Sequence, residues 1–278
     1  MILTIPTDVI CTQLGNEEGF RPIKETGFDG VDFSFYRKNE AEALGEDYME
    51  HAEKFKALLK NYDLICNQAH APFNFTYGHP MDYTDPMYQK MVRSMEVSAF
   101  LGIKQIVVHG FVVPEGVDRV QANLDFFKSL EPYCKKFGIK IAIENLRLST
   151  KTLETHNHIL ESLNPEYFVG LVDVGHAILQ GYTAQEYIAG ILPGRLQGLH
   201  THDNFGQKDD HLLPGLGVIE WDQVINALAE RNYPGDFTLE TNNFERIYGE
   251  NFIKETLQFN YMVTRRLADQ LDAALKER

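Results

Sequence analysis

Histidine and carboxylate side chains recur at the ends of short apolar segments along this chain of 278 residues. Six successive segments finish in such a side chain, in the order His70, His109, Glu144, Asp173, His200 and Glu240. One polar residue after a strand usually caps a loop, so a single instance would mean little. If the segments are strands of one closed barrel, however, their ends meet at one mouth. Carboxylates and imidazoles confined there need a compensating charge, which a divalent cation supplies.

Further candidate ligands lie close to these six in the chain. His176 follows Asp173 by three residues, and Asp209 and His211 form a D-x-H pair on a loop that contains Gly and Pro. His202 shares a face with His200 if that strand continues, so it could contact a substrate or act as an alternative ligand; we favour His200 as the ligand. Mixed imidazole and carboxylate ligands suit zinc, manganese, iron or cobalt better than calcium.

Eight apolar, mostly β-branched segments predict the strands that would position these side chains. They lie at 2–5, 30–35, 64–69, 105–108, 139–143, 168–172, 196–199 and 236–239. Most of them are continuously apolar, which is typical of parallel strands that are covered on both faces.

Amphipathic stretches between the segments predict helices. Asp85 and Pro86 form an N-terminal cap for a helix over 87–101 that stops at Gly102, and a second helix is predicted over 117–137 before Gly138. This alternation predicts an α/β fold, a single (β/α)8 TIM barrel domain over 1–278. An open doubly wound sheet is the alternative, but no GxGxxG motif follows the first segment.

The composition limits which binding partners and which cellular compartment we expect. The formal net charge of −14 argues mildly against a nucleic-acid partner, because polyanions are attracted to basic surfaces. No run of 18 apolar residues and no secretory signal is present, so we expect neither a spanning helix nor export. The three cysteines share no motif, and they fit a reducing cytoplasm. A homo-oligomer stays an open alternative.

The ordered motifs H-A-P-F-N, V-V-H-G, I-E-N, D-V-G-H-A, L-H-T-H-D-N, D-D-H-L-x-P-G-x-G and L-E-T carry a family resemblance. Together they resemble the sugar phosphate isomerase/epimerase group of the xylose-isomerase-like TIM barrels, over nearly the whole chain. Each motif alone is short, whereas their ordered combination is specific for the superfamily.

The resemblance to the ketose epimerases of that group implies one manganese or related ion. Its ligands would be Glu144, Asp173, His200 and Glu240. The two glutamates would also be the catalytic acid/base pair, and His176 would contact the substrate. Further substrate contacts are expected at His70, His109, His202 and Arg147.

A second branch of the superfamily, the zinc-dependent apurinic-site endonucleases, holds a cluster of three metal ions. Its pattern also matches, at His70, His109, Glu144, Asp173, His176, His200, Asp209, His211 and Glu240. The chain departs from both branches. Residues 203–207 lack the arginine usual in the epimerases, and His109 is followed by Gly110 and Phe111 rather than by the His-Pro-Gly of the endonucleases.

We therefore expect a divalent-metal-dependent isomerase or epimerase of a small sugar, sugar phosphate or polyol derivative. It would transfer a proton next to a metal-chelated carbonyl group. Two alternatives remain. One is a metal-cluster phosphodiester hydrolase of the apurinic-site endonuclease type, and the other is a non-catalytic metal-binding barrel.

Overall fold

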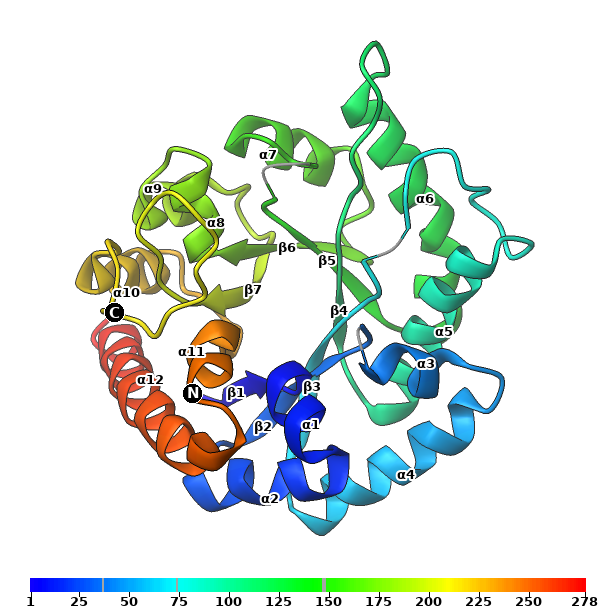
Figure 1. Ribbon diagram of the computed structural model, residues 1–278. Coiled ribbons are helices and arrows are strands. Elements are labelled where there is room, and N and C mark those ends of the chain that lie inside the picture. The colour runs from blue at the N-terminus through cyan, green and yellow to red at the C-terminus, as the bar shows by residue number, and fades with distance from the viewer. Residues whose placement is uncertain (37, 74, 147–148) are drawn as a thin grey trace.

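The strands of the protein close into a parallel barrel. The computed structural model describes residues 1–36, 38–73, 75–146 and 149–278. The strands pair in chain order, and β8 pairs with β1 to complete the ring (Figure 1). They are β1 (Leu3–Pro6), β2 (Gly30–Ser34), β3 (Ile65–His70), β4 (Gln105–Val108), β5 (Lys140–Glu144), β6 (Phe168–Asp173), β7 (Leu196–Thr201) and β8 (Phe237–Leu239). The predicted TIM barrel is confirmed.

Helices surround this barrel (Figure 1). They are α1 (Asp8–Leu14), α2 (Asn16–Thr26), α3 (Lys38–Leu44), α4 (Tyr48–Asn61), α5 (Pro86–Leu101), α6 (Arg119–Phe137), α7 (Leu153–Glu161), α8 (Val174–Leu179), α9 (Ala184–Gly190), α10 (Trp221–Glu230), α11 (Asn242–Tyr248), the 3₁₀ helix η1 (Glu250–Phe252) and α12 (Ile253–Lys276). The last helix, α12, packs between α10 and α2 and so completes the outer ring. Within the described ranges, no helix has the length and apolar character needed to cross a membrane.

The capping residues explain where two of the helices begin. Asp85 Oδ1 accepts hydrogen bonds from the first-turn amides of α5, which confirms the predicted cap. The helix predicted over 117–137 begins instead at Arg119. Asp118 is its cap, because its Oδ1 accepts from the amide nitrogens of Val120 and Gln121 at 3.0 and 3.1 Å. That predicted start was therefore wrong by two residues.

Several strands continue further than their apolar segments suggested. β3, β5 and β6 end on His70, Glu144 and Asp173, and β7 includes His200. The backbone ladder continues through these polar residues: the amide nitrogen of Phe35 donates to the carbonyl oxygen of His70 at 2.9 Å. An inward-facing polar side chain does not interrupt this ladder. The candidate metal ligands therefore lie on the strands themselves as well as on the loops that follow them.

Alternation along the strands separates two apolar layers. Outward side chains join the large core between barrel and helices, whereas Val107, Ala142, Val169 and Leu171 form a separate buried cluster. Since side chains alternate with period two, the residue two positions after an inner one also faces inward. Ala142 is thus followed by Glu144, and Leu171 by Asp173. The inner apolar layer lies beneath the polar mouth.

The buried carboxyl group of Glu245 connects α11 to α12. Glu245 is 2% exposed, and its Oε1 accepts hydrogen bonds from Thr241 Oγ1 at 2.6 Å and from Asn260 Nδ2. Burial raises the pKa of Glu245 to about 7 from its ordinary value of 4.5, although the two hydrogen bonds oppose the shift. The folded protein therefore holds this proton at a pH where the unfolded chain has lost it.

Replacing Glu245 should change how stability depends on pH. The stabilising effect of the raised pKa is present below pH 4.5 and is lost as the pH rises through 7, at a cost on the order of 3 kcal/mol. The free energy of unfolding of Glu245→Gln should not fall in this way. Chemical denaturation between pH 5 and pH 8 should therefore show the variant gaining stability relative to the unmodified protein as the pH rises. The exposed Glu255→Gln is the control. Identical pH dependence for Glu245→Gln and the unmodified protein would contradict the assignment.

Candidate metal centre

The carboxyl ends of the strands bring the predicted ligands to the barrel mouth. Glu144 and Asp173 end β5 and β6, His200 lies in β7, and Glu240 follows β8 directly. Their ligand atoms lie within 4.8 Å of one another, and all four residues are buried. These four form what we call the central group. Their convergence depends on closure of the barrel, because they come from four different strands.

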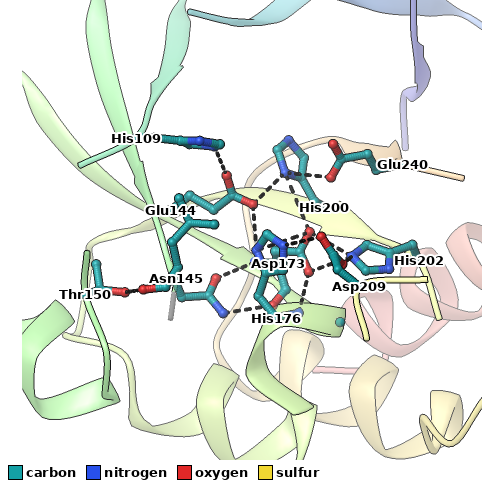
Figure 2. A network of polar contacts seen from close by, with 12 residues as sticks. His109, Glu144, Asn145, Thr150, Asp173, His176, His200, His202, Asp209 and Glu240 are labelled. Carbon is teal, nitrogen blue, oxygen red and sulfur yellow. Dashed lines mark hydrogen bonds and ion pairs between the residues drawn. The ribbon is translucent and has the colours of Figure 1, made fainter. Parts of the chain in front are cut away.

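His200 lies between the carboxylates of the central group, as Figure 2 shows. Its Nδ1 is 3.4 Å from Glu144 Oε1, 3.4 Å from Glu240 Oε2 and 3.9 Å from Asp173 Oδ2. Glu240 Oε2 is buried and accepts no hydrogen bond from the described residues. A buried carboxylate oxygen without a donor is costly, and a cation among these atoms would remove that cost. The residues therefore fit a divalent metal ion.

Glu144 also belongs to a second group, with His70 and His109. Its Oε2 lies 2.6 Å from His109 Nε2 and 4.0 Å from His70 Nε2, whereas its Oε1 faces the central group. The two oxygens of one carboxylate thus face two sets of donors. Glu144 would therefore be able to help hold an ion in either group.

A third group combines His176, Asp209 and His211 with His202. Asp209 Oδ2 is 3.2 Å from His176 Nε2 and 2.9 Å from His211 Nε2. Burial alone would lower the pKa of His211, but Glu240 and Asp209 raise it to about 9. The D-x-H loop therefore does lie at the same mouth as the central group.

His202 lies beneath the mouth and not on its surface. The residue is fully buried, and its Nε2 lies 2.9 Å from Asp173 Oδ1. A Cβ atom on Gly175 would come within 2.1 Å of the His202 ring, so only glycine leaves room for it. His202 therefore contacts Asp173 of the central group, and its predicted roles as a substrate contact or an alternative ligand stay predictions.

Asp203 holds the loop that carries Asp209 and His211 in place through hydrogen bonds. Its carboxylate accepts hydrogen bonds from the amide nitrogens of Gly215 and Ile219, and from Trp221 Nε1 at 3.0 Å. Trp221 is buried at the start of α10. The loop is therefore anchored at both ends.

Asn145 connects β5 to β6 directly below the central group. Its Oδ1 accepts from the backbone amide of Asp173 at 2.6 Å, and its Nδ2 donates to the carbonyl oxygen of Asp173 at 2.9 Å. Asp173 in turn caps α8, because its Oδ1 accepts from the amide of His176 at 2.7 Å. Asn145 belongs to the I-E-N motif, although the motif by itself predicts no role for this residue.

The electrostatics of the mouth follow from its buried carboxylates. Burial alone would raise the pKa of Glu144, but His109 and His176 hold it well below its usual range. Burial would likewise raise the pKa of Asp173, whereas His176 and His202 lower it to about 2. Both carboxylates therefore depend on neighbouring positive charge, which a divalent ion would supply in place of protonated imidazoles.

Arg147, a predicted substrate contact, lies outside the described residues. Two residues inside the barrel were missed: Asp32 on β2 and Gln68 on β3, both buried. The signal that could have found Asp32 is its position in Gly30–Ser34, where it interrupts apolar residues at an inward-facing place.

The pattern of the xylose isomerase-like TIM barrel matches residues 20–260. The chain belongs to this family. Fructoselysine 3-epimerase of Escherichia coli O157:H7 is 24% identical over 240 residues, which cover 81% of this chain and 84% of that relative. The uncharacterized protein y4fM of Sinorhizobium fredii is 32% identical over 168 residues, or 53% of this chain. This match spans 50% of that relative's length.

Solved structures share the family fold over the whole chain. A D-tagatose 3-epimerase-like protein superposes with a TM-score of 0.78 at 19% identity, covering 98% of this chain and 99% of that one. The IOLI protein with a binding zinc atom superposes with a TM-score of 0.73 at 17% identity, covering 99% of both chains. At these identities the likeness shows the fold.

The three groups predict that more than one metal ion binds. Zinc titration of the metal-free protein, followed by calorimetry, should saturate above one equivalent. The double variant Asp209→Ala with His211→Ala should bind about one equivalent less, because it removes two donors of the third group and leaves the central group intact. Asp210→Asn, a neighbouring carboxylate whose Oδ2 accepts from the Phe205 amide, is the control. Saturation of the unmodified protein at one equivalent would leave Asp209 and His211 as candidate substrate contacts only.

Proposed function

We propose that this protein is a divalent-metal-dependent isomerase or epimerase of a small sugar, sugar phosphate or polyol derivative. The observation that carries the proposal is the central group, in which Glu144 and Glu240 lie on either side of His200 (Figure 2). The relatives support it as well, since one of them is named fructoselysine 3-epimerase and another 2-oxo-tetronate isomerase.

The reaction requires a proton to leave a carbon next to a carbonyl group. A bound divalent ion would polarise that carbonyl and stabilise the negative charge that develops on its oxygen. Asp173 and His200 would hold the ion together with the two glutamates. Glu144 and Glu240 come from β5 and β8, so they would reach opposite sides of the substrate carbon and serve as base and acid.

Besides His211 of the D-x-H loop, whose side chain is 17% exposed, two imidazoles of the mouth reach the solvent and would orient the substrate. The side chains of His109 and His176 are 21% and 11% exposed, whereas those of His70 and His200 are almost completely buried. Phe73, which is partly exposed, stacks on the His109 ring with centroids 4.6 Å apart. We therefore assign hydroxyl contacts to His109 and His176. His70 would be a contact only if no second ion binds beside it.

Proton exchange with solvent tests this chemistry. A substrate found by screening ketoses, inososes and their phosphates should acquire deuterium at one carbon in heavy water, because the abstracted proton equilibrates before it returns. Glu144→Gln and Glu240→Gln should each reduce turnover by at least about 100-fold. Mass spectrometry follows the label, and metal content is measured on the same samples.

The informative variant keeps its metal, loses turnover and still exchanges the proton that faces the remaining glutamate. Glu220→Gln, an exposed glutamate before α10, is the control for the loss of one charge. Turnover without any solvent label would contradict proton exchange at these glutamates. It would indicate a shielded proton or a hydride shift, with Glu144 and Glu240 as metal ligands only.

A phosphodiester hydrolase of the apurinic-site endonuclease type is the second candidate. The observation that favours it is that all nine side chains of that pattern are gathered in the three groups at one mouth. Clustered ions could activate a water molecule and stabilise a leaving oxygen. Against it stands the net charge of −14, which opposes the approach of a phosphate backbone.

Incision of DNA separates the two candidates. We expect a duplex with one abasic site to be cut no faster by the zinc-loaded protein than by the protein with chelator, because the acidic chain repels the backbone. A gel assay at two salt concentrations measures this, with an intact duplex as the control substrate. Efficient, metal-dependent incision that weakens steeply with salt would overturn the isomerase proposal.

A further inference from the structure

Asp32 lies inside the barrel beneath two of the metal-ligand candidates. It is on β2, it is fully buried, and no role followed for it from the sequence. Its Oδ2 is 3.4 Å from His70 Nδ1 and 3.5 Å from His200 Nε2. The two imidazole rings are stacked, with centroids 4.6 Å apart. One carboxylate oxygen therefore faces two histidines that belong to different groups.

The nitrogens that face Asp32 are the rear nitrogens of these rings. The front nitrogen of His70, Nε2, faces Glu144, and the front nitrogen of His200, Nδ1, faces Glu144 and Glu240. When the front nitrogen of a histidine binds a metal ion, its rear nitrogen carries the proton and needs an acceptor. Asp32 Oδ2 lies at ion-pair distance from both rear nitrogens, and His70 Nδ1 has no hydrogen-bond partner among the described residues, so this oxygen is the candidate acceptor for both protons.

We propose that Asp32 is a shared positioning residue, which fixes the ring orientation and tautomer of His70 and His200 for metal binding. It would act through these two histidines without touching either ion. Because one histidine belongs to the central group and the other to the group with His109, a change at Asp32 should weaken both sites together. The inference rests on metal binding at this mouth, as the proposed function does.

The alternative is that Asp32 is itself a metal ligand, since its oxygen, His70 and His200 also form a group of donors. Gln68 argues against this. Its Nε2 donates to Asp32 Oδ2 at 3.0 Å. The same nitrogen is 2.9 Å from His200 Nε2, which can accept from it only while the proton of this ring is on Nδ1. Binding of an ion at Nδ1 therefore moves that proton to Nε2 and breaks this one contact with Gln68. An amide NH₂ group donates hydrogen bonds and has no lone pair to offer, so it repels a cation at this place.

The orientation of the Gln68 amide is fixed by its neighbours. Gln105 Nε2 lies 3.2 Å from the carbonyl oxygen of Gln197, which can only accept, so Gln105 presents its NH₂ group. The same nitrogen donates to Gln68 Oε1 at 2.9 Å, which leaves the Gln68 NH₂ group turned toward Asp32. The barrel interior thus surrounds Asp32 Oδ2 with donors and not with further metal ligands.

Zinc affinity and zinc stoichiometry together test the proposal. Asp32→Asn keeps the shape of the side chain and removes its charge. We expect it to bind zinc roughly 10- to 100-fold more weakly, in competition with a chromophoric chelator, and to reach the same number of ions at saturation. Asp29→Asn is the matched control, because it removes one exposed charge just before the same strand. Circular dichroism checks that both variants are folded.

Each other outcome overturns the proposal in a defined way. Loss of one ion at saturation would make Asp32 a ligand, and unchanged affinity would leave it without a role in metal binding. Should Asp32→Asn fail to fold, the unmodified zinc-loaded protein still provides a test. In its ¹H–¹⁵N spectra the proton should be on Nδ1 of His70 and on Nε2 of His200, and the opposite tautomers would contradict the proposal. An unmodified protein that binds no zinc would instead refute the proposed function.

Discussion

The buried carboxylate of Glu144 is the contact on which the arrangement of the mouth depends. Its Oε2 faces His109 at 2.6 Å, and its Oε1 faces His176 at 3.1 Å and His200 at 3.4 Å. A carboxylate with so little access to water is stable only beside positive charge or strong donors. The three imidazoles come from three different parts of the barrel. Closure of the sheet is therefore what makes burial of Glu144 tolerable.

The central and third groups are positioned by different means. The central group lies on or next to strands, so hydrogen-bond register sets its geometry; Asp173, for example, pairs with His200 across β6 and β7. Asp209 and His211 come from a loop, and Asp203 must hold that loop through side-chain bonds to backbone amides. Sites on rigid strands keep their geometry more precisely than sites on loops. Chemistry that needs close alignment is therefore best served by the central group.

The same donors can serve two kinds of reaction, because a barrel fold does not choose the chemistry. Proton transfer next to a carbonyl group needs carboxylates on two sides of the substrate, and in the proposed function Glu144 and Glu240 would fill this role around His200. Phosphodiester hydrolysis needs several ions and a surface that accepts a polyanion. The three groups of candidate ligands fit the first part of that requirement, whereas a net charge of −14 opposes the second. Charge thus separates the two candidates more clearly than the ligands do.

Local signals in the sequence were sufficient to predict the strands, the cap at Asp85 and the polar side chains at the strand ends. The periodicity of hydrophobic residues and helix capping depend only on residues close together in the chain. They did not reveal the role of Asp32: its place in an otherwise apolar strand was a signal, but only the closed barrel shows that it faces His70 and His200. Nor did they show that His202 lies behind Asp173 or that Glu144 joins two groups. Those features depend on register between strands far apart in the chain. The sequence alone determined which residues could bind a metal, and only the closed barrel decided which of them meet.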